Sequence, residues 1–274
     1  MNTMLDEFSL LEHRGWQRVA GKYEEAWSGL TRLFIPHLLQ AAEITHGARV
    51  LDVACGPGYV AEAALALGAA PVGVDFSAEM IALARNRNPR IEFHEGDAQQ
   101  LDFEDSRFDV VLMNFGLLHL AMPEAALSEA HRVLRLGGRF GFTVWAGPGE
   151  SPGARIVEAA VKAHADMSVE MPTGPDYFAF ADSAQCRKTL GRAGFDPGSL
   201  VFETVTVEWQ VPTASFLFES EQNAGVRTAA LLARQTASVL KAIKAQVEAS
   251  VRAHATEDGF AIPFAAHVIT VRAA

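Results

Sequence analysis

Apolar residues recur along the 274-residue chain with two different periods. Short apolar runs predict buried strands, and segments with apolar residues three or four positions apart predict helices. Between residues 48 and 145 the two kinds of segment alternate, which is typical of a parallel sheet with helices on both faces. The expected elements are a strand at 49–54, a helix at 58–67, a strand at 71–75, a helix at 78–86, strands at 90–94 and 108–114, a helix at 123–135 and a strand at 139–145.

The alternation becomes less regular after residue 145. Helices are expected at 153–165 and from Asp182 or Ser183 to Ala193, and strands at 200–211 and 264–272. Residues 213–256 have helical character. No linker or repeat interrupts the chain, so we expect a single domain over residues 1–274, with cap insertions at 147–180 and 213–256.

Residues 1–46 are mostly helical in character. Large apolar residues recur there at steps of three, four or seven and form one face, until Pro36 bends or ends the helix. This face is either packed on the core or part of an N-terminal helical lid, in which Tyr23 and Trp27 close over a ligand. The face comprises Trp16, Tyr23, Trp27, Leu30, Phe34 and Leu38.

Charge and cysteine content narrow the function. The net charge of −10 argues against a duplex nucleic-acid partner, whose phosphates favour a basic surface. The two cysteines, Cys55 and Cys186, suggest neither a disulfide framework nor a metal cluster, so we expect no bound metal and a cytoplasmic location. The N-terminus lacks the apolar core of a signal peptide, and the longest low-charge run, 63–74, is too short to span a bilayer. We therefore expect no membrane partner.

One stretch carries the most specific signal. Residues 50–61 read V-L-D-V-A-C-G-P-G-Y-V-A, which predicts a strand, a tight turn at Gly56 and Gly58, and a helix. This unit brings a backbone close to a nucleotide-like ligand, and a side chain at either glycine would block that approach. A glycine turn without a ligand is the alternative.

Two ligand classes fit this turn. The stretch G-P-G-Y-V-A also matches the dinucleotide pattern G-x-G-x-x-G/A, with Asp75 about 20 residues further on. Asp52, at the end of the strand, favours the other class. A carboxylate at this place would repel a pyrophosphate but would suit the ammonium and sulfonium of S-adenosylmethionine.

Five motifs occur in order between residues 48 and 145: V-L-D-V-A-C-G-P-G, G-V-D-F-S, E-G-D-A, F-D-V-V-L-M-N-F and R-V-L-R-L-G-G-R-F. In this set and spacing the chain resembles the class I S-adenosylmethionine-dependent methyltransferases, especially the ubiquinone and menaquinone biosynthesis C-methyltransferases. The chain departs from the usual motifs at Ala54, where glycine is common, and at Asp102, where proline is common. The resemblance implies a Rossmann-like, doubly wound, mostly parallel seven-stranded sheet.

The resemblance also implies S-adenosyl-L-methionine as cofactor and a set of residues that bind it. Asp75 would accept hydrogen bonds from both ribose hydroxyls, Asp52 would lie near the ammonium, and Asp97 would bind the adenine amino group. The full expected cofactor set is Tyr23, Asp52, Ala54, Cys55, Gly56, Asp75, Phe76, Met80, Gly96, Asp97, Ala98, Asn114 and Phe115.

Methyl transfer from a sulfonium requires alignment of the nucleophile and exclusion of water, and a base only for a weakly acidic acceptor. His119 is the candidate base or substrate ligand. The alternative is that His119 is only a polar cap of the helix that follows it.

Aromatic residues favour a small, apolar or aromatic acceptor bound by Trp27, His119, Tyr177 and Phe178. Three other functions are compatible with the sequence. The protein could use the cofactor as a fixed charge in a reaction that does not consume it, it could be a nicotinamide-dependent oxidoreductase, or it could be a non-catalytic protein. The acceptor atom and a homodimer are left open.

Overall fold

The computed structural model describes residues 6–274 and divides into two compact units, which are described separately. We call the first the helical unit. It contains the chain up to Leu30, Ala146–Thr173 and Thr206–Ala266. The second is the sheet unit, which contains Thr31–Trp145, Gly174–Val205 and His267–Ala274. The predicted lid and cap insertions remain a prediction.

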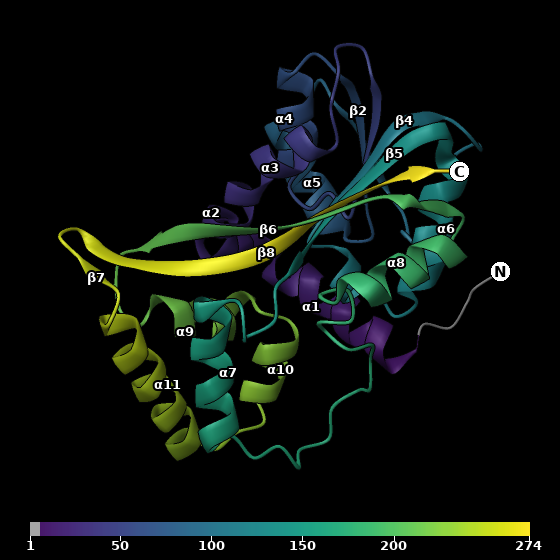
Figure 1. The fold of residues 1–274 in the computed structure, drawn as a ribbon. Coiled ribbons are helices and arrows are strands. Elements are labelled where there is room, and N and C mark those ends of the chain that lie inside the picture. Colours follow the sequence, from purple (N-terminus) through teal and green to yellow (C-terminus); the bar gives the residue numbers. More distant parts are fainter. Residues whose placement is uncertain (1–5) are drawn as a thin grey trace. The chain divides into compact units, whose positions relative to one another are not determined.

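The strands form one sheet in the order β3-β2-β1-β4-β5-β8-β6, and β7 pairs with β8 off this path (Figure 1). Neighbouring strands from β3 to β5 run parallel. This order confirms the predicted doubly wound, mostly parallel sheet, and it places β1 and β4 at the point where the strand order reverses. The sheet has eight strands and not the expected seven, because the short β7 adds to the seven strands of the main path. The strands are β1 (Arg49–Val53), β2 (Ala70–Asp75), β3 (Glu92–Glu95), β4 (Phe108–Asn114), β5 (Leu134–Trp145), β6 (Phe195–Val211), β7 (Ala255–Thr256) and β8 (Gly259–Ala273).

Helices cover both faces of the sheet unit. Successive residues of β5 point to opposite faces because side chains alternate along a strand. Phe140 and Phe142 pack in a buried cluster with residues of α6 and α8. Gly141 between them lies against Leu38 and Ala42, at the end of α3. The helical segments are η2 (Arg32–Phe34), α3 (Ile35–Ala41), α4 (Tyr59–Ala66), α5 (Ala78–Arg87), η3 (Leu117–His119), α6 (Pro123–Val133) and α8 (Ser183–Arg192).

In the helical unit, α7 packs against α11, and α9 packs against α1 and the π-helix η1. α11 buries one apolar face at Ile243, Val247 and Val251. None of the helices described within residues 6–274 is long and apolar enough to cross a bilayer. The helices are α1 (Glu7–Tyr23), η1 (Glu24–Ser28), α7 (Pro152–His164), α9 (Phe216–Ala224), α10 (Arg227–Leu232) and α11 (Ala237–Arg252), and α2 (Gly29–Thr31) crosses the boundary between the units.

Three expected elements differ in the structure. The expected helical stretch at 213–256 divides into α9, α10, α11 and β7. The strand expected at 139–145 begins earlier, because α6 ends at Val133 and Leu134 already pairs with Phe108 at the start of β5. Pro36 lies in the first turn of α3, where its missing N–H costs no hydrogen bond.

Candidate functional site

The glycine turn joins β1 to α4, as predicted. Ala54, Gly56 and Gly58 have left-handed backbones, with φ of 53°, 50° and 82°. The N–H of Cys55 donates to the carbonyl of Val74 across 3.0 Å, which ties the turn to β2. The turn therefore begins at the carboxyl edge of two neighbouring parallel strands, where open α/β sheets bind ligands.

The two glycines serve different purposes. A Cβ atom added at Gly56 would meet nothing within 4 Å, whereas one at Gly58 would lie 2.7 Å from the ring of Phe93. The expectation that both glycines leave room for a ligand is therefore wrong for Gly58, whose missing side chain makes room for β3. Gly56 borders open space, as a backbone that is closely approached by a ligand requires.

Asp75 links β2 to the glycine turn. Its Oδ2 accepts a hydrogen bond from the Gly56 N–H (2.8 Å), and its Oδ1 accepts one from the Ser77 N–H (2.9 Å). The side chain is buried, but each carboxylate oxygen has a second lone pair. Asp75 can thus accept two ribose hydroxyls while it orders the turn. Ser77 caps α5 by accepting from the Met80 N–H, as predicted.

Asp52 is a buried carboxylate directly before the turn, with a relative exposure of 1%. Its Oδ2 accepts from the Ala61 N–H (3.0 Å), and its Oδ1 has no hydrogen-bond partner among residues 6–274. The pKa of Asp52 is raised to about 8, mainly by burial; the hydrogen bond from Ala61 opposes this shift, and the charge of Asp75 adds to it. An unpaired buried oxygen beside a second carboxylate suits a cationic ligand.

The adjacent Cys55 shares this environment. Its thiol is buried, and burial raises its pKa well above the ordinary value, with the charges of Asp52 and Asp75 acting in the same direction. Cys55 is therefore a neutral packing residue of the turn.

The predicted adenine-binding turn follows β3. The N–H of Gly96 donates to the carbonyl of Asp75 across 2.9 Å, so this turn lies beside the ribose site. Asp97 is exposed, and its carboxylate accepts from the backbone and side-chain amides of Gln99. Ala98 and Met80 are buried. Gln99, whose side chain also accepts from the Met122 N–H, was not among the expected site residues, because no motif distinguishes it.

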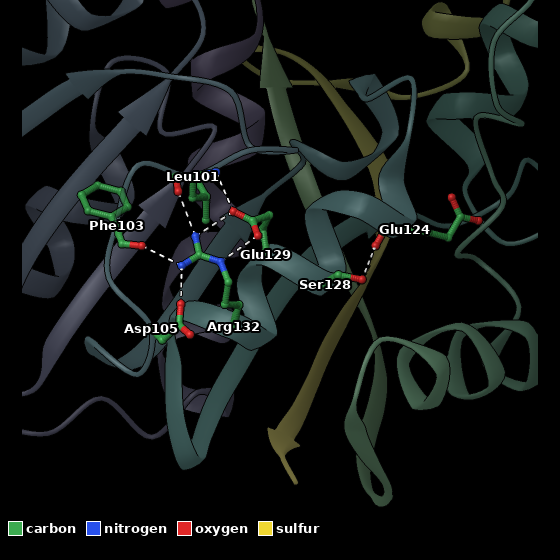
Figure 2. A network of polar contacts seen from close by, with 7 residues as sticks. All are labelled: Leu101, Phe103, Asp105, Glu124, Ser128, Glu129 and Arg132. Carbon is green, nitrogen blue, oxygen red and sulfur yellow. Dashed lines mark hydrogen bonds and ion pairs between the residues drawn. The ribbon is translucent and has the colours of Figure 1, made fainter. Parts of the chain in front are cut away.

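An ion-pair network holds the segment after this turn (Figure 2). The guanidinium of Arg132 on α6 donates to the carbonyls of Leu101 and Phe103 and to the carboxylates of Asp105 and Glu129. Glu129 also accepts from the Leu101 N–H at 2.7 Å. The network thereby fixes residues 101–105 on α6.

The end of β4 is tied to β5. Thr143, a residue the sequence analysis missed, donates through Oγ1 to Asn114 Oδ1 (2.6 Å) and accepts from the Phe115 N–H (2.9 Å). The side-chain amide of Asn114 donates to the carbonyl of Thr31 (3.3 Å). Asn114 therefore holds the segment before α3 at the carboxyl edge of the sheet.

Three aromatic rings meet at the same edge. Phe115 stacks on Trp145 with centroids 4.0 Å apart, and Phe34 contacts both rings edge-on. Phe115 has a φ of 59°, which is rare for a bulky residue and is characteristic of functional sites. Trp145, at the end of β5, was absent from the expected site, although its place two residues after Thr143 at a strand terminus was a usable signal.

The structure brings together three of the expected substrate residues. The rings of His119 in η3 and Tyr177 lie 6.3 Å apart, and Phe178 contacts Tyr177 edge-on at 5.2 Å. Tyr23 and Trp27 belong to the helical unit, where Tyr23 packs on Trp16 and Trp27 stacks on Trp209. The lid role of these two residues stays a prediction.

Comparison with known proteins identifies the class. Residues 51–142 match the sequence profile of a family described as a methyltransferase domain. A demethylmenaquinone methyltransferase of Renibacterium salmoninarum is 40% identical over 111 residues, which are 40% of this chain and 47% of that protein. The chain thus spans about half the length of this curated relative.

Two solved structures share the fold. A phosphoethanolamine N-methyltransferase of Haemonchus contortus has a TM-score of 0.57 at 19% identity, covering 98% of this chain and 61% of that one. The 4+2 cyclase SpnF has a TM-score of 0.58 at 19% identity, covering 98% of both chains. At such identities the likeness concerns the fold alone.

Residues 51–142 therefore match a methyltransferase domain, and the predicted resemblance to the class I, S-adenosylmethionine-dependent methyltransferases, especially the quinone C-methyltransferases, is confirmed. The predicted cofactor, S-adenosyl-L-methionine, is confirmed at the level of this class. The observed site fits it, because the space at Gly56, the acceptor oxygens of Asp75 and the unpaired oxygen of Asp52 match a cationic nucleoside.

Proposed function

We propose that this protein transfers the methyl group of S-adenosyl-L-methionine to a small, apolar or aromatic metabolite. The observation that carries the proposal is the hydrogen bond from Gly56 to Asp75, which joins an open glycine turn to a buried carboxylate. The cofactor supplies a methyl group activated by its sulfonium charge. The demethylmenaquinone methyltransferase relatives support a small-molecule acceptor.

The cofactor residues have separate proposed roles. Asp75 binds the ribose hydroxyls, Asp52 compensates the positive charge of the amino-acid end, and the turn at Gly96–Ala98 binds adenine with Asp97. Phe76 and Met80 flank the adenine ring. Ala54, Cys55 and Gly56 line the methionine portion, and Asn114 and Phe115 hold the end of β4 beneath the sulfonium.

His119 is the proposed proton acceptor for an acceptor that must be deprotonated. The support is its place in η3, three residues after the Gly116 that follows β4, and its contact with Tyr177. Tyr177 and Phe178, which belong to the sheet unit as His119 does, are the proposed acceptor contacts. We expect His119→Gln to lower kcat about 100-fold with little change in cofactor affinity.

The experiment that tests the function follows both products. The purified protein is incubated with S-adenosylmethionine and a panel of quinols and phenols that includes demethylmenaquinol. Mass spectrometry then detects an acceptor heavier by one methylene and an equal amount of S-adenosylhomocysteine. A changed acceptor without S-adenosylhomocysteine would instead indicate the alternative in which the cofactor is not consumed. Binding of a nicotinamide dinucleotide in place of S-adenosylmethionine would contradict the proposal.

A further inference from the structure

Arg32 is a charged residue with no counter-ion in the part of the chain that the structure describes. Among residues 6–274, no carboxylate forms an ion pair with its exposed guanidinium. By contrast, Arg49 pairs with Asp109, and Arg139 pairs with Glu43. The chain has acidic side chains in excess, with a net charge of −10. The guanidinium of Arg32 nevertheless forms no ion pair within residues 6–274, so it is available for an anionic ligand.

The position of Arg32 is fixed at both ends. The residue before it, Thr31, accepts a hydrogen bond through its carbonyl from the Asn114 side chain at the end of β4. The guanidinium carbon of Arg32 lies 4.5 Å from the centroid of the Tyr59 ring. Tyr59 is the first residue of α4 and follows Gly58 directly. Arg32 therefore extends from the end of β4 to the start of α4.

These two places border the region where the amino-acid end of the cofactor is proposed to bind. That end carries an ammonium and a carboxylate. The site supplies the Asp52 carboxylate for the ammonium, but none of the residues assigned so far provides a cation for the carboxylate. A cation–π contact orients a guanidinium without neutralising it, and a guanidinium binds a carboxylate through two parallel hydrogen bonds.

We propose that the guanidinium of Arg32, held over the ring of Tyr59, binds the α-carboxylate of S-adenosylmethionine. The inference rests on the proposed function, because it assigns a contact of the same cofactor. It makes Arg32 the residue that distinguishes the complete amino-acid end of the cofactor from an end without its carboxylate.

Arg87 provides a matched control. Its guanidinium carbon also lies 4.3 Å from the centroid of the Tyr59 ring. However, Arg87 ends α5, and its Nη2 donates to the Tyr59 hydroxyl across 2.7 Å. Because α5 starts at the carboxyl edge of the sheet and runs away from it, its last residue, Arg87, lies at the end of the helix that is remote from this edge.

The test compares S-adenosylmethionine with decarboxylated S-adenosylmethionine by titration calorimetry. The two ligands differ only in the α-carboxylate. For Arg32→Gln we expect a Kd for S-adenosylmethionine that is about 10- to 100-fold higher, with a change of less than about threefold for the decarboxylated ligand. Arg32→Lys should retain part of the preference. Arg87→Gln should keep the ratio of the two Kd values of the unaltered protein.

The outcomes separate this inference from the proposed function. If Arg32→Gln weakens both ligands equally, Arg32 acts through its packing on Tyr59, and the inference is wrong. Unchanged Kd values for both ligands in Arg32→Gln would also overturn the inference. If the unaltered protein binds neither ligand, the proposed function itself fails. Thermal unfolding of each variant checks that the fold is intact.

Discussion

The carboxylate of Asp75 accepts a hydrogen bond from the backbone N–H of Gly56 across 2.8 Å. This contact connects the end of β2 with the turn that follows β1, and it aims a buried acceptor at the one glycine of the turn that borders open space. The same carboxylate therefore shapes the turn and offers hydrogen-bond acceptors to a ligand.

Replacing Asp75 should consequently weaken cofactor binding. We expect Asp75→Ala to cost about 1.5–3 kcal/mol in binding of S-adenosylmethionine, the range for a hydrogen bond to a charged group. Asp75→Asn, which keeps one carbonyl acceptor, should cost less. Calorimetric titration measures both, and Asp196→Asn, which alters a remote carboxylate that accepts from the Gly198 N–H, is the control. Equal affinity in Asp75→Ala and the unaltered protein would contradict the assignment.

The buried Asp52 predicts a particular dependence of stability on pH. Its pKa in the folded state is about 8, above the ordinary value of 3.8. Its contribution to stability is therefore complete below pH 4 and is lost as the pH rises through 8. Since one pKa unit corresponds to about 1.4 kcal/mol, the loss is on the order of a few kcal/mol.

Asp52→Asn isolates this contribution, because the amide does not titrate. The free energy of unfolding, measured with urea between pH 5 and pH 9, should fall more steeply with pH for the unaltered protein than for Asp52→Asn. Parallel curves for the two proteins would show that Asp52 stays ionised in the fold.

Ala54 and Gly116 form a close pair. A Cβ atom added at Gly116 would lie 2.6 Å from the Cβ of Ala54 and 2.8 Å from the Cγ of Met113. Gly116 has a φ of −83°, so the backbone itself accepts alanine and the contact alone opposes it. Gly116→Ala should therefore destabilise the protein by about 1–3 kcal/mol, the usual cost of overpacking.

The cost should shrink when Ala54 is glycine. In a double-mutant cycle measured by chemical denaturation, we expect a coupling of about 1 kcal/mol between Ala54→Gly and Gly116→Ala. Ala54→Gly alone should have a small effect, because relief of the left-handed backbone offsets the added chain entropy. Additive effects would mean that Met113, and not Ala54, limits the space.

The network of Figure 2 predicts sensitivity to acid. Hydrogen bonding from Arg132 lowers the pKa of Glu129 below its ordinary value of 4.5, although partial burial acts against it. The stability that Glu129 contributes is therefore present above pH 4.5 and is lost as the pH falls through its lowered pKa. We expect Glu129→Gln to destabilise the protein by about 1–2 kcal/mol at pH 7 and by less at pH 3.5.

Glu124→Gln is the matched control for this prediction. Glu124 lies on the same helix, and its backbone carbonyl accepts from Ser128, so the substitution preserves that bond. The free energy of unfolding of Glu124→Gln should stay within about 0.5 kcal/mol of that of the unaltered protein. If Glu124→Gln and Glu129→Gln shift stability equally, the network does not hold the segment as we infer.

Much of the sheet unit could be predicted from the sequence. The alternation of apolar strands and helices, the glycines of the first turn and the Ser77 cap act through local chemistry, which a single sequence displays. The same holds for Asp75 at the end of an apolar strand. The reason for Gly58 could not be predicted, because it depends on Phe93, a residue 35 positions away whose ring lies against it.

The rest of the site arises from contacts distant in sequence. Thr143 interrupts an apolar strand, and only the pairing of β4 with β5 places it beside Asn114. Arg32 and Trp145 have no local motif, and their partners Tyr59 and Phe115 lie on other elements. The π-helix at Glu24–Ser28 likewise has no signature in an apolar face of helical period.

The structure of the protein with bound S-adenosylhomocysteine tests the central claim most directly. We predict density in the space beside Gly56, with both ribose hydroxyls within hydrogen-bond distance of the Asp75 carboxylate. A nucleoside bound elsewhere, or a side chain filling the space at Gly56, would contradict the account.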